Sequence, residues 1–129
     1  MDRKQLQDRG IAIRNEVLGP AYHTKSLADF DDFTRPFQEF AAAYCWGELW
    51  GRDDLPRKTR SLINVALLAG LNRLPELRLH VLGALRNGCT EKEIQGALLQ
   101  CIVYCGVAAG GEGFRVAREA IAEFRRQPA

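Results

Sequence analysis

The chain has 129 residues, of which 47% are hydrophobic and 26% charged, and its formal net charge is +2. This size and composition are typical of one globular domain with a buried core, here expected over residues 1–129. The small, scattered positive charge argues against nucleic acid as a partner. No run of 18 apolar residues is present to cross a membrane, and the polar start MDRKQLQDRG is unlike a signal peptide, so we expect a cytoplasmic protein.

The apolar spacing in the first third of the chain predicts helices. A first helix is expected over residues 3–18, ended by Gly19-Pro20, and a connection over residues 20–30 follows it. A second helix is expected from about Asp31 to Trp46. Its apolar residues recur at steps of three and four, which predicts a core stripe made of Phe33, Phe37, Phe40, Ala41 and Tyr44.

Both tryptophans, Trp46 and Trp50, lie one helical turn apart in the segment WGELWGR, which ends at Arg52. Two indoles beside a guanidinium can form the wall of a pocket for a planar anion. They can equally close the end of a core or form a contact between subunits. The residues leave these alternatives open.

The next helix is expected over residues 53–71 and begins near Pro56. Its run SLINVALLAGL, from Ser61 to Leu71, is apolar on nearly every side apart from Asn64. Such a helix must be buried all round, which predicts a central helix, a subunit interface or both. Arg60, just before this run, is disfavoured by the helix dipole, so it is a candidate for binding a substrate carboxylate. The alternative is that its charge is simply solvated.

A further helix is expected from Pro75 to a stop at Asn87-Gly88. Glu76 and His80 are four residues apart, about 40° around a helix that turns roughly 100° per residue. A carboxylate beside an imidazole can act as an acid/base pair. The same spacing is also an ordinary helix-stabilising pair, and Glu76 suits the helix dipole in the first turn.

The last third of the chain predicts two more helices. A capping box over residues 90–93 opens one that reaches about Cys105, and the other ends near Phe124. The glycines between Gly106 and Gly113 predict close helix contacts or a helix break. No window alternates with period two, so the expected fold is all-α with about six helices.

The four cysteines form no CxxC pair, and two histidines are too few to suggest a metal site. Cys101 and Cys105 lie on the apolar face of the predicted helix that ends at about Cys105. We therefore expect the cysteines to pack in the core, and we expect no redox or metal chemistry from them.

Several segments, in this order and spacing, resemble the carboxymuconolactone decarboxylase family across about residues 10–124. They are WGELWGR from Trp46, LPRKTRSL from Leu55, ELRLHV from Glu76, NGCTEKEI from Asn87 and YCGV from Tyr104. The resemblance implies an all-helical fold shared with alkyl-hydroperoxidase D, assembled as a homotrimer or a homohexameric ring. It also implies cofactor-free decarboxylation of a γ-carboxy-γ-lactone in aromatic-acid catabolism, within the protocatechuate branch of the β-ketoadipate route.

The chain departs from its relatives at two kinds of position. The hydroperoxidase relatives carry a CxxC pair where this chain has Arg73 and Glu76, so the resemblance implies no disulfide peroxidase chemistry. Ala108 stands where the family usually has proline, and Glu112 where a histidine is common. These departures keep two alternatives open. One is an isomerase or lyase acting on another small organic acid, and the other is a non-catalytic, ring-forming ligand-binding protein.

Under the resemblance, His80 donates a proton or a hydrogen bond to the oxyanion of the reacting lactone. Glu76 would orient His80 and raise the population of its protonated form. The substrate-binding residues are expected to clamp carboxylates or exclude water in a pocket near a subunit boundary. They are Arg52, Arg60, Trp46, Trp50 and Tyr104. No cofactor and no metal are expected, and the partner is a small carboxylated lactone or a related organic acid.

Overall fold

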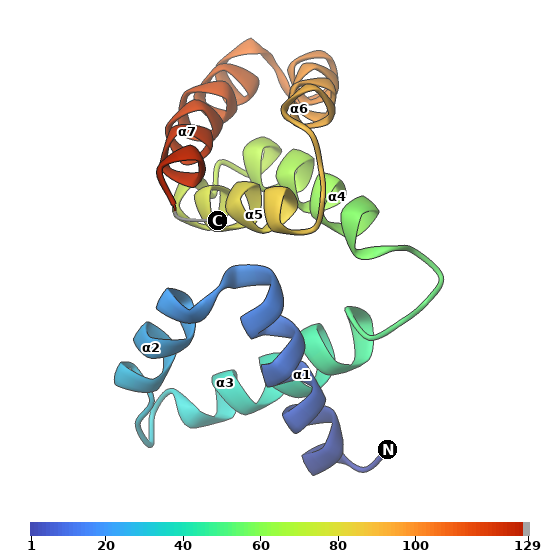
Figure 1. Ribbon diagram of the computed structural model, residues 1–129, viewed down its shortest axis with the longest axis vertical. Coiled ribbons are helices and arrows are strands. Elements are labelled where there is room, and N and C mark those ends of the chain that lie inside the picture. Colours follow the sequence, from blue (N-terminus) through green and yellow to red (C-terminus); the bar gives the residue numbers. More distant parts are fainter. Residues whose placement is uncertain (128–129) are drawn as a thin grey trace. The chain divides into compact units, whose positions relative to one another are not determined.

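The computed structural model describes residues 1–127, and the described chain consists of helices joined by turns, without a strand (Figure 1). The all-α class is confirmed. Seven α-helices and one π-helical segment are present in the described part, against about six helices expected. By its internal contacts the chain divides into two compact units, Met1–Leu55 and Pro56–Ala129.

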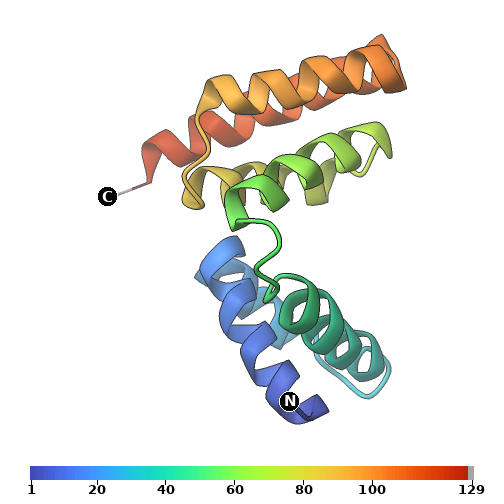
Figure 2. The ribbon, with the colours of Figure 1, turned by 90° about the vertical axis from the view of Figure 1, so that its right-hand side faces the viewer.

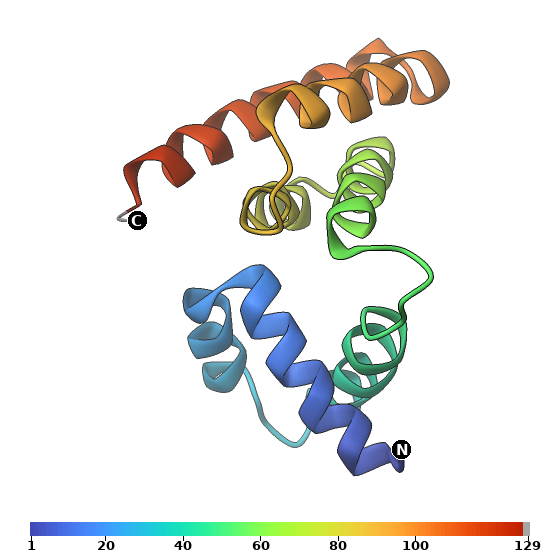
Figure 3. The same ribbon diagram turned by 45° about the vertical axis from the view of Figure 1, so that its right-hand side comes forward.

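The first unit is built from α1 (Arg3–Leu18), α2 (Pro20–Ala28), α3 (Arg35–Phe40) and a π-helical continuation of α3, η1 (Ala41–Leu49). Helix α1 packs along η1 (Figure 3). The approach is so close that a Cβ atom on Gly10 would overlap the Ala42 carbonyl oxygen, and one on Gly47 would overlap the Leu6 carbonyl oxygen. Glycine at these two positions is therefore what allows the two backbones to touch.

Two expectations for this unit are wrong. Residues 20–28 form helix α2, where a connection was expected, because Pro20 suits the start of a helix as well as the end of the previous one. The aromatic stripe is exposed instead of buried, with Phe33 at 92% and Phe37 at 73% exposure. Small residues decide which side of η1 meets α1, so Ala42 and Ala43 are buried there in place of the large rings.

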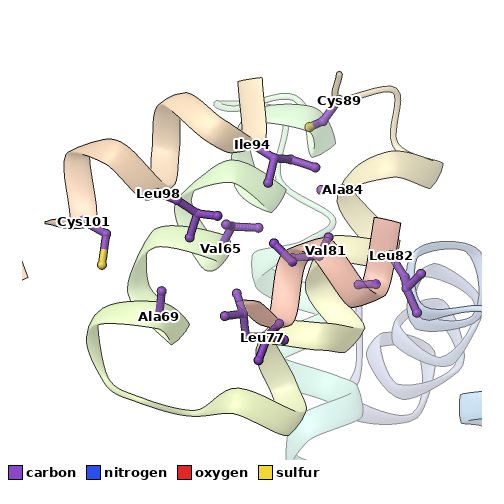
Figure 4. Close-up of a cluster of buried hydrophobic side chains, with 13 residues drawn as sticks. Val65, Ala69, Leu77, Val81, Leu82, Ala84, Cys89, Ile94, Leu98 and Cys101 are labelled. Carbon is purple, nitrogen blue, oxygen red and sulfur yellow. The ribbon is translucent and has the colours of Figure 1, made fainter. Parts of the chain in front are cut away.

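The second unit holds α4 (Arg57–Gly70), α5 (Leu74–Arg86), α6 (Glu91–Cys105) and α7 (Val107–Arg126). Helix α4 pairs with α5, α6 pairs with α7, and the two pairs pack on each other (Figure 2). Their apolar faces share one core, whose side chains Figure 4 shows converging from the separate helices. Its fully buried members include Val65, Leu77, Val81, Ile94 and Leu98.

The expected boundaries in this unit are confirmed by their local geometry. Helix α5 ends before Gly88, which has a φ of 93°, and Gly106 separates α6 from α7 with a φ of 107°. At the start of α6, the Thr90 hydroxyl accepts from the Glu93 amide at 3.0 Å. The Glu93 carboxylate accepts from the Thr90 amide at 2.9 Å, which completes the capping box.

Two burial expectations are only partly met. Helix α4 buries Val65 and Ala69, yet Leu67 and Leu71 are 54% and 67% exposed, so this chain alone does not bury the helix on all sides. Cys89 and Cys101 are buried as expected, but Cys45 and Cys105 are exposed, and Cys105 lies in the last turn of α6. Among the described helices, none has the length and apolar character required to cross a membrane.

The glycines at the start of α7 differ in a way that predicts opposite effects of the same substitution. A Cβ on Gly110 would lie 3.0 Å from Ile102 Cα and overlap its side chain, whereas one on Gly111 would meet nothing within 4 Å. We expect Gly110→Ala to lower the free energy of unfolding by about 1–3 kcal/mol, because the overlap forces α6 and α7 apart. Gly111→Ala should raise it by about 0.5–1 kcal/mol, through helix propensity alone. Urea unfolding of the two variants checks this, and equal effects would contradict the close contact.

Candidate active site

The second unit carries a layer of polar side chains between α4 and α5. The two helices run antiparallel around a short turn, so residues later in α5 face residues earlier in α4. The Asn64 side-chain nitrogen lies 3.5 Å from His80 Nδ1. Further along α5, the Asn87 amide donates to Ser61 Oγ at 2.9 Å. His80 of the predicted pair therefore faces an amide group supplied by α4, and Asn87 further along α5 faces a hydroxyl group of α4.

His80 is neutral at neutral pH. Burial lowers its pKa from the ordinary 6.5 to about 4, and this effect outweighs the nearby Glu76 carboxylate, which acts to raise the pKa. The sequence-based expectation that Glu76 would raise the protonated population has the right sign for Glu76 alone. It is wrong for the net shift in pKa, because burial destabilises the charged imidazole more than the exposed Glu76 carboxylate stabilises it.

The contact with Asn64 fits one tautomer of the neutral imidazole. A side-chain amide nitrogen can only donate, so in the tautomer with its hydrogen on Nε2 the ring accepts from Asn64 through Nδ1, 3.5 Å away. In that tautomer the ring has a hydrogen on Nε2 without carrying a charge. Such a neutral donor suits a developing oxyanion, which is one of the two roles expected for His80.

Arg60 and Ser61 are buried at the start of α4, with exposed fractions of 8% and 0%. Arg60 lies one helical turn before Asn64, on the same side of α4. A guanidinium held at low exposure interacts with an anion more strongly than a solvated one. This burial argues against a simply solvated cation, and the carboxylate-binding role of Arg60 stays a prediction.

The remaining predicted site residues lie in different surroundings. Trp46 and Trp50 are buried in the first unit and stack with ring centroids 5.0 Å apart, which favours the core alternative over an open pocket wall. Arg52 is exposed and pairs with Asp54 at 3.0 Å. Tyr104 is 80% exposed and borders a groove between α4 and α6 that His80 does not line. Their roles in substrate binding stay predictions.

Two polar neighbours of the site, Asn64 and Ser61, were not among the predicted site residues. The signal for Asn64 is present in the sequence, because it is the main polar interruption of an otherwise apolar run. Its partner can be found only when α4 and α5 are known to be antiparallel neighbours.

The lowered pKa of His80 predicts a pH-dependent stability. The pKa of His80 is about 4 in the folded chain and 6.5, its ordinary value, in the unfolded chain. Between pH 4 and 6.5 the unfolded chain therefore binds more protons than the folded one. Stability should therefore fall as the pH drops from 6.5 toward 4, by on the order of 2–3 kcal/mol. Urea unfolding of the wild type and of His80→Gln, at both ends of this window, measures the effect. The same pH dependence in both proteins would contradict it.

Comparison with known proteins places this chain in a family. Residues 35–119 match the model of the Carboxymuconolactone decarboxylase family. The 4-carboxymuconolactone decarboxylase of Acinetobacter baylyi is 39% identical over 119 residues, which are 92% of this chain and 89% of that protein. The nitrosuccinic acid decarboxylase of Metarhizium robertsii is 42% identical over 118 residues, 92% of this chain and 82% of that protein.

Over nearly its whole length, the protein is related to carboxy-lyases. The chain belongs to the carboxymuconolactone decarboxylase family, as its sequence segments indicated, and is a decarboxylase of that family. The two relatives are named for different acids, so family membership alone does not identify the acid that this chain decarboxylates.

Proposed function

We propose that the protein is a cofactor-independent decarboxylase of small organic acids, with 4-carboxymuconolactone as its substrate in the breakdown of aromatic acids. The observation that carries the proposal is the neutral His80, held by Asn64 in the polar layer between α4 and α5. The similarity to the Acinetobacter enzyme, over 89% of that protein, supports the choice of substrate.

The proposed reaction needs no cofactor because the substrate accepts its own electrons. The departing carboxylate of a 4-carboxymuconolactone sits on the carbon γ to the lactone carbonyl and is connected to it through a C=C bond. When the bond to CO2 breaks, its electron pair moves along this conjugated path onto the carbonyl oxygen and forms an oxyfuran-like enolate. The carbon α to the carbonyl then takes a proton that comes ultimately from solvent, and the product is the enol-lactone.

The chain's own residues then have three tasks: to hold carboxylates, to stabilise the enolate oxygen and to exclude water. His80 would donate its Nε2 hydrogen to that oxygen, and Glu76 would orient the ring. Arg60 would bind a carboxylate through its planar guanidinium. Arg52, Trp46, Trp50 and Tyr104 complete the proposed set on the strength of the sequence resemblance.

A second substrate, nitrosuccinate, is favoured by the relative in Metarhizium, which is 42% identical. A carboxylate on the carbon that bears a nitro group can leave in the same way, because the nitro oxygens accept the electron pair as a nitronate. Both acids carry a second carboxylate, and both produce an oxyanion for a neutral donor to stabilise. The departures at Ala108 and Glu112 from the family pattern are compatible with such a change of acid.

We propose further that the protein assembles as a homotrimer or a homohexameric ring, as the family resemblance implies. The exposed apolar side of α4 supports an assembly of some kind, because this helix is too apolar to face water along its length. The number of subunits is read from the mass of the assembly in solution.

The two candidate acids are separated by incubating the purified protein with each and following CO2 release. We expect release from 4-carboxymuconolactone with the larger kcat/KM. Release from nitrosuccinate alone would replace the proposed substrate with the second one. No release from either acid would contradict the proposed activity and favour a protein that binds acids without converting them.

A further inference from the structure

Arg14 of α1 is a buried cation in the first unit, with an exposed fraction of 8%. The residues one helical turn away on either side are all uncharged: Gly10, Ile11, Val17 and Leu18. Within the described part of the chain, the buried Nε atom of Arg14 has no hydrogen-bond partner. Because a buried charge is costly unless it is paired, this position favours a negative partner for Arg14.

The groups that contact Arg14 supply no negative charge. The Tyr22 ring centroid lies 5.7 Å from Arg14 Cζ, and His23 Nδ1 lies 3.3 Å from Arg14 Nη2. A guanidinium can only donate, so the second contact fits a neutral ring that accepts through Nδ1. Burial lowers the pKa of Arg14, and the group that acts to raise this pKa is Tyr22, not a carboxylate. These contacts orient the guanidinium without balancing its charge.

Arg14 borders a pocket of about 180 Å³ that the helices of the first unit enclose. Ser26 of α2 and Gln38 of α3 also line it. Ser26 Oγ donates to Gln38 Oε1 at 2.9 Å, and Gln38 Nε2 donates to the Ser26 carbonyl oxygen at 3.1 Å. This second bond uses one of the two hydrogens on Nε2, and the other is available to an acceptor.

The lining of the pocket suits a carboxylate on a short carbon chain. Leu27 and Phe30 add apolar side chains beside the buried cation and the Gln38 amide. Few polar groups among apolar walls are typical of sites for small molecules. The volume corresponds to roughly six water-sized groups at about 30 Å³ each, which limits the ligand to a small acid.

Glu39 limits the charge of the ligand. It lines the same pocket, its side chain is 37% exposed, and one carboxylate oxygen lies 3.9 Å from Arg35 Nε. The Arg14 guanidinium balances one negative charge, and Glu39 repels any further one. The pocket therefore favours an acid with a single carboxylate over a dicarboxylate or phosphate.

We propose that the pocket around Arg14 binds the carboxylate of a small monocarboxylic acid, which accepts hydrogen bonds from the Arg14 guanidinium and the Gln38 amide. The ligand supplies the negative charge that the surrounding helices do not provide. The proposal gives the pocket no step in the decarboxylation, so it holds whichever acid is the substrate. It also holds if the protein binds acids without converting them.

Acetate is the probe, because it carries one carboxylate on a single methyl group. The chain has two histidines, and His23 contacts Arg14, so its imidazole NMR signals report on this pocket separately from those of His80. In the full chain with ¹³C-labelled histidine, sodium acetate replaces sodium chloride at constant pH and ionic strength. We expect the His23 signals to shift until they saturate, which gives the Kd for acetate.

Two pairs of variants locate the binding. Arg14→Gln removes the buried charge and should abolish the saturable shift, whereas Arg3→Gln, exposed on the same helix and outside the pocket, should leave the Kd unchanged. Glu39→Gln should lower the Kd by about 2- to 5-fold, because it removes a partly exposed like charge. Glu48→Gln, exposed on η1 and outside the pocket, is its control.

Several outcomes overturn the proposal. His23 signals that ignore acetate, or that shift without saturating, would mean that the pocket binds no carboxylate. An unchanged Kd in Arg14→Gln, with its helix content kept by circular dichroism, would remove the guanidinium from the site. If that variant does not fold, an unchanged Kd in Glu39→Gln has the same force. Tighter binding of phosphate or succinate than of acetate would contradict the preference for a single carboxylate.

Discussion

Replacing His80 by alanine is expected to lower kcat for decarboxylation by a factor of about 10² to 10⁴, the usual contribution of a positioned proton or hydrogen-bond donor. The loss should appear mainly in kcat, because the enolate oxygen bears its full charge only near the transition state. His80 is not a member of the hydrophobic core, so the helices should form normally.

The chain offers a matched control for this variant. His23, its other histidine, lies in the first unit, with its Nδ1 atom 3.3 Å from the Arg14 guanidinium. His23→Ala removes the same side chain and should leave kcat within a small factor of the wild type. Wild-type turnover in His80→Ala would remove this residue from the mechanism.

The second large effect is expected at Arg60. Arg60→Lys keeps the charge but loses the planar fork that holds a carboxylate with two hydrogen bonds. A charge-assisted hydrogen bond contributes about 1.5–3 kcal/mol, so kcat/KM should fall by roughly 10- to 150-fold. The fall should appear largely in KM, because the carboxylate is bound before and during the reaction.

Thermal unfolding must accompany these kinetics, because Arg60 is buried and its replacement can also affect the fold. Arg115→Lys on α7 is the comparison, since Arg115 is exposed and pairs with Glu112 at 2.9 Å. It should change neither kcat/KM nor stability appreciably. An unchanged KM in Arg60→Lys, with the fold intact, would show that the guanidinium does not hold the substrate.

Local signals allowed the elements of the second unit to be predicted closely. Pro75, the Asn87-Gly88 stop and the capping box at Thr90 each act within a few residues, so they could be recognised without tertiary structure. Burial in the first unit could not be predicted this way. The side of η1 that faces α1 is set by close backbone contact at Gly10, and aromatic spacing carries no information about that contact.

In the candidate site, too, some features could be predicted from local sequence and others needed the tertiary structure. The spacing of Glu76 and His80 identified the pair, because both residues lie on one helix. The role of Asn64 needed the antiparallel register of α4 and α5, which places it 16 positions away in sequence but 3.5 Å away in space. The net shift in the pKa of His80 needed its burial, which outweighs the neighbouring carboxylate that the sequence revealed.

The most direct test of the mechanism is decarboxylation of 4-carboxymuconolactone in D2O by protein freed of metal ions and small molecules, with NMR of the product. We expect CO2 and enol-lactone in equal amounts, with one deuterium on the carbon α to the carbonyl, because the enolate takes its proton from solvent. Conversion no faster than in the protein-free solution, or a product without deuterium at that carbon, would contradict the mechanism.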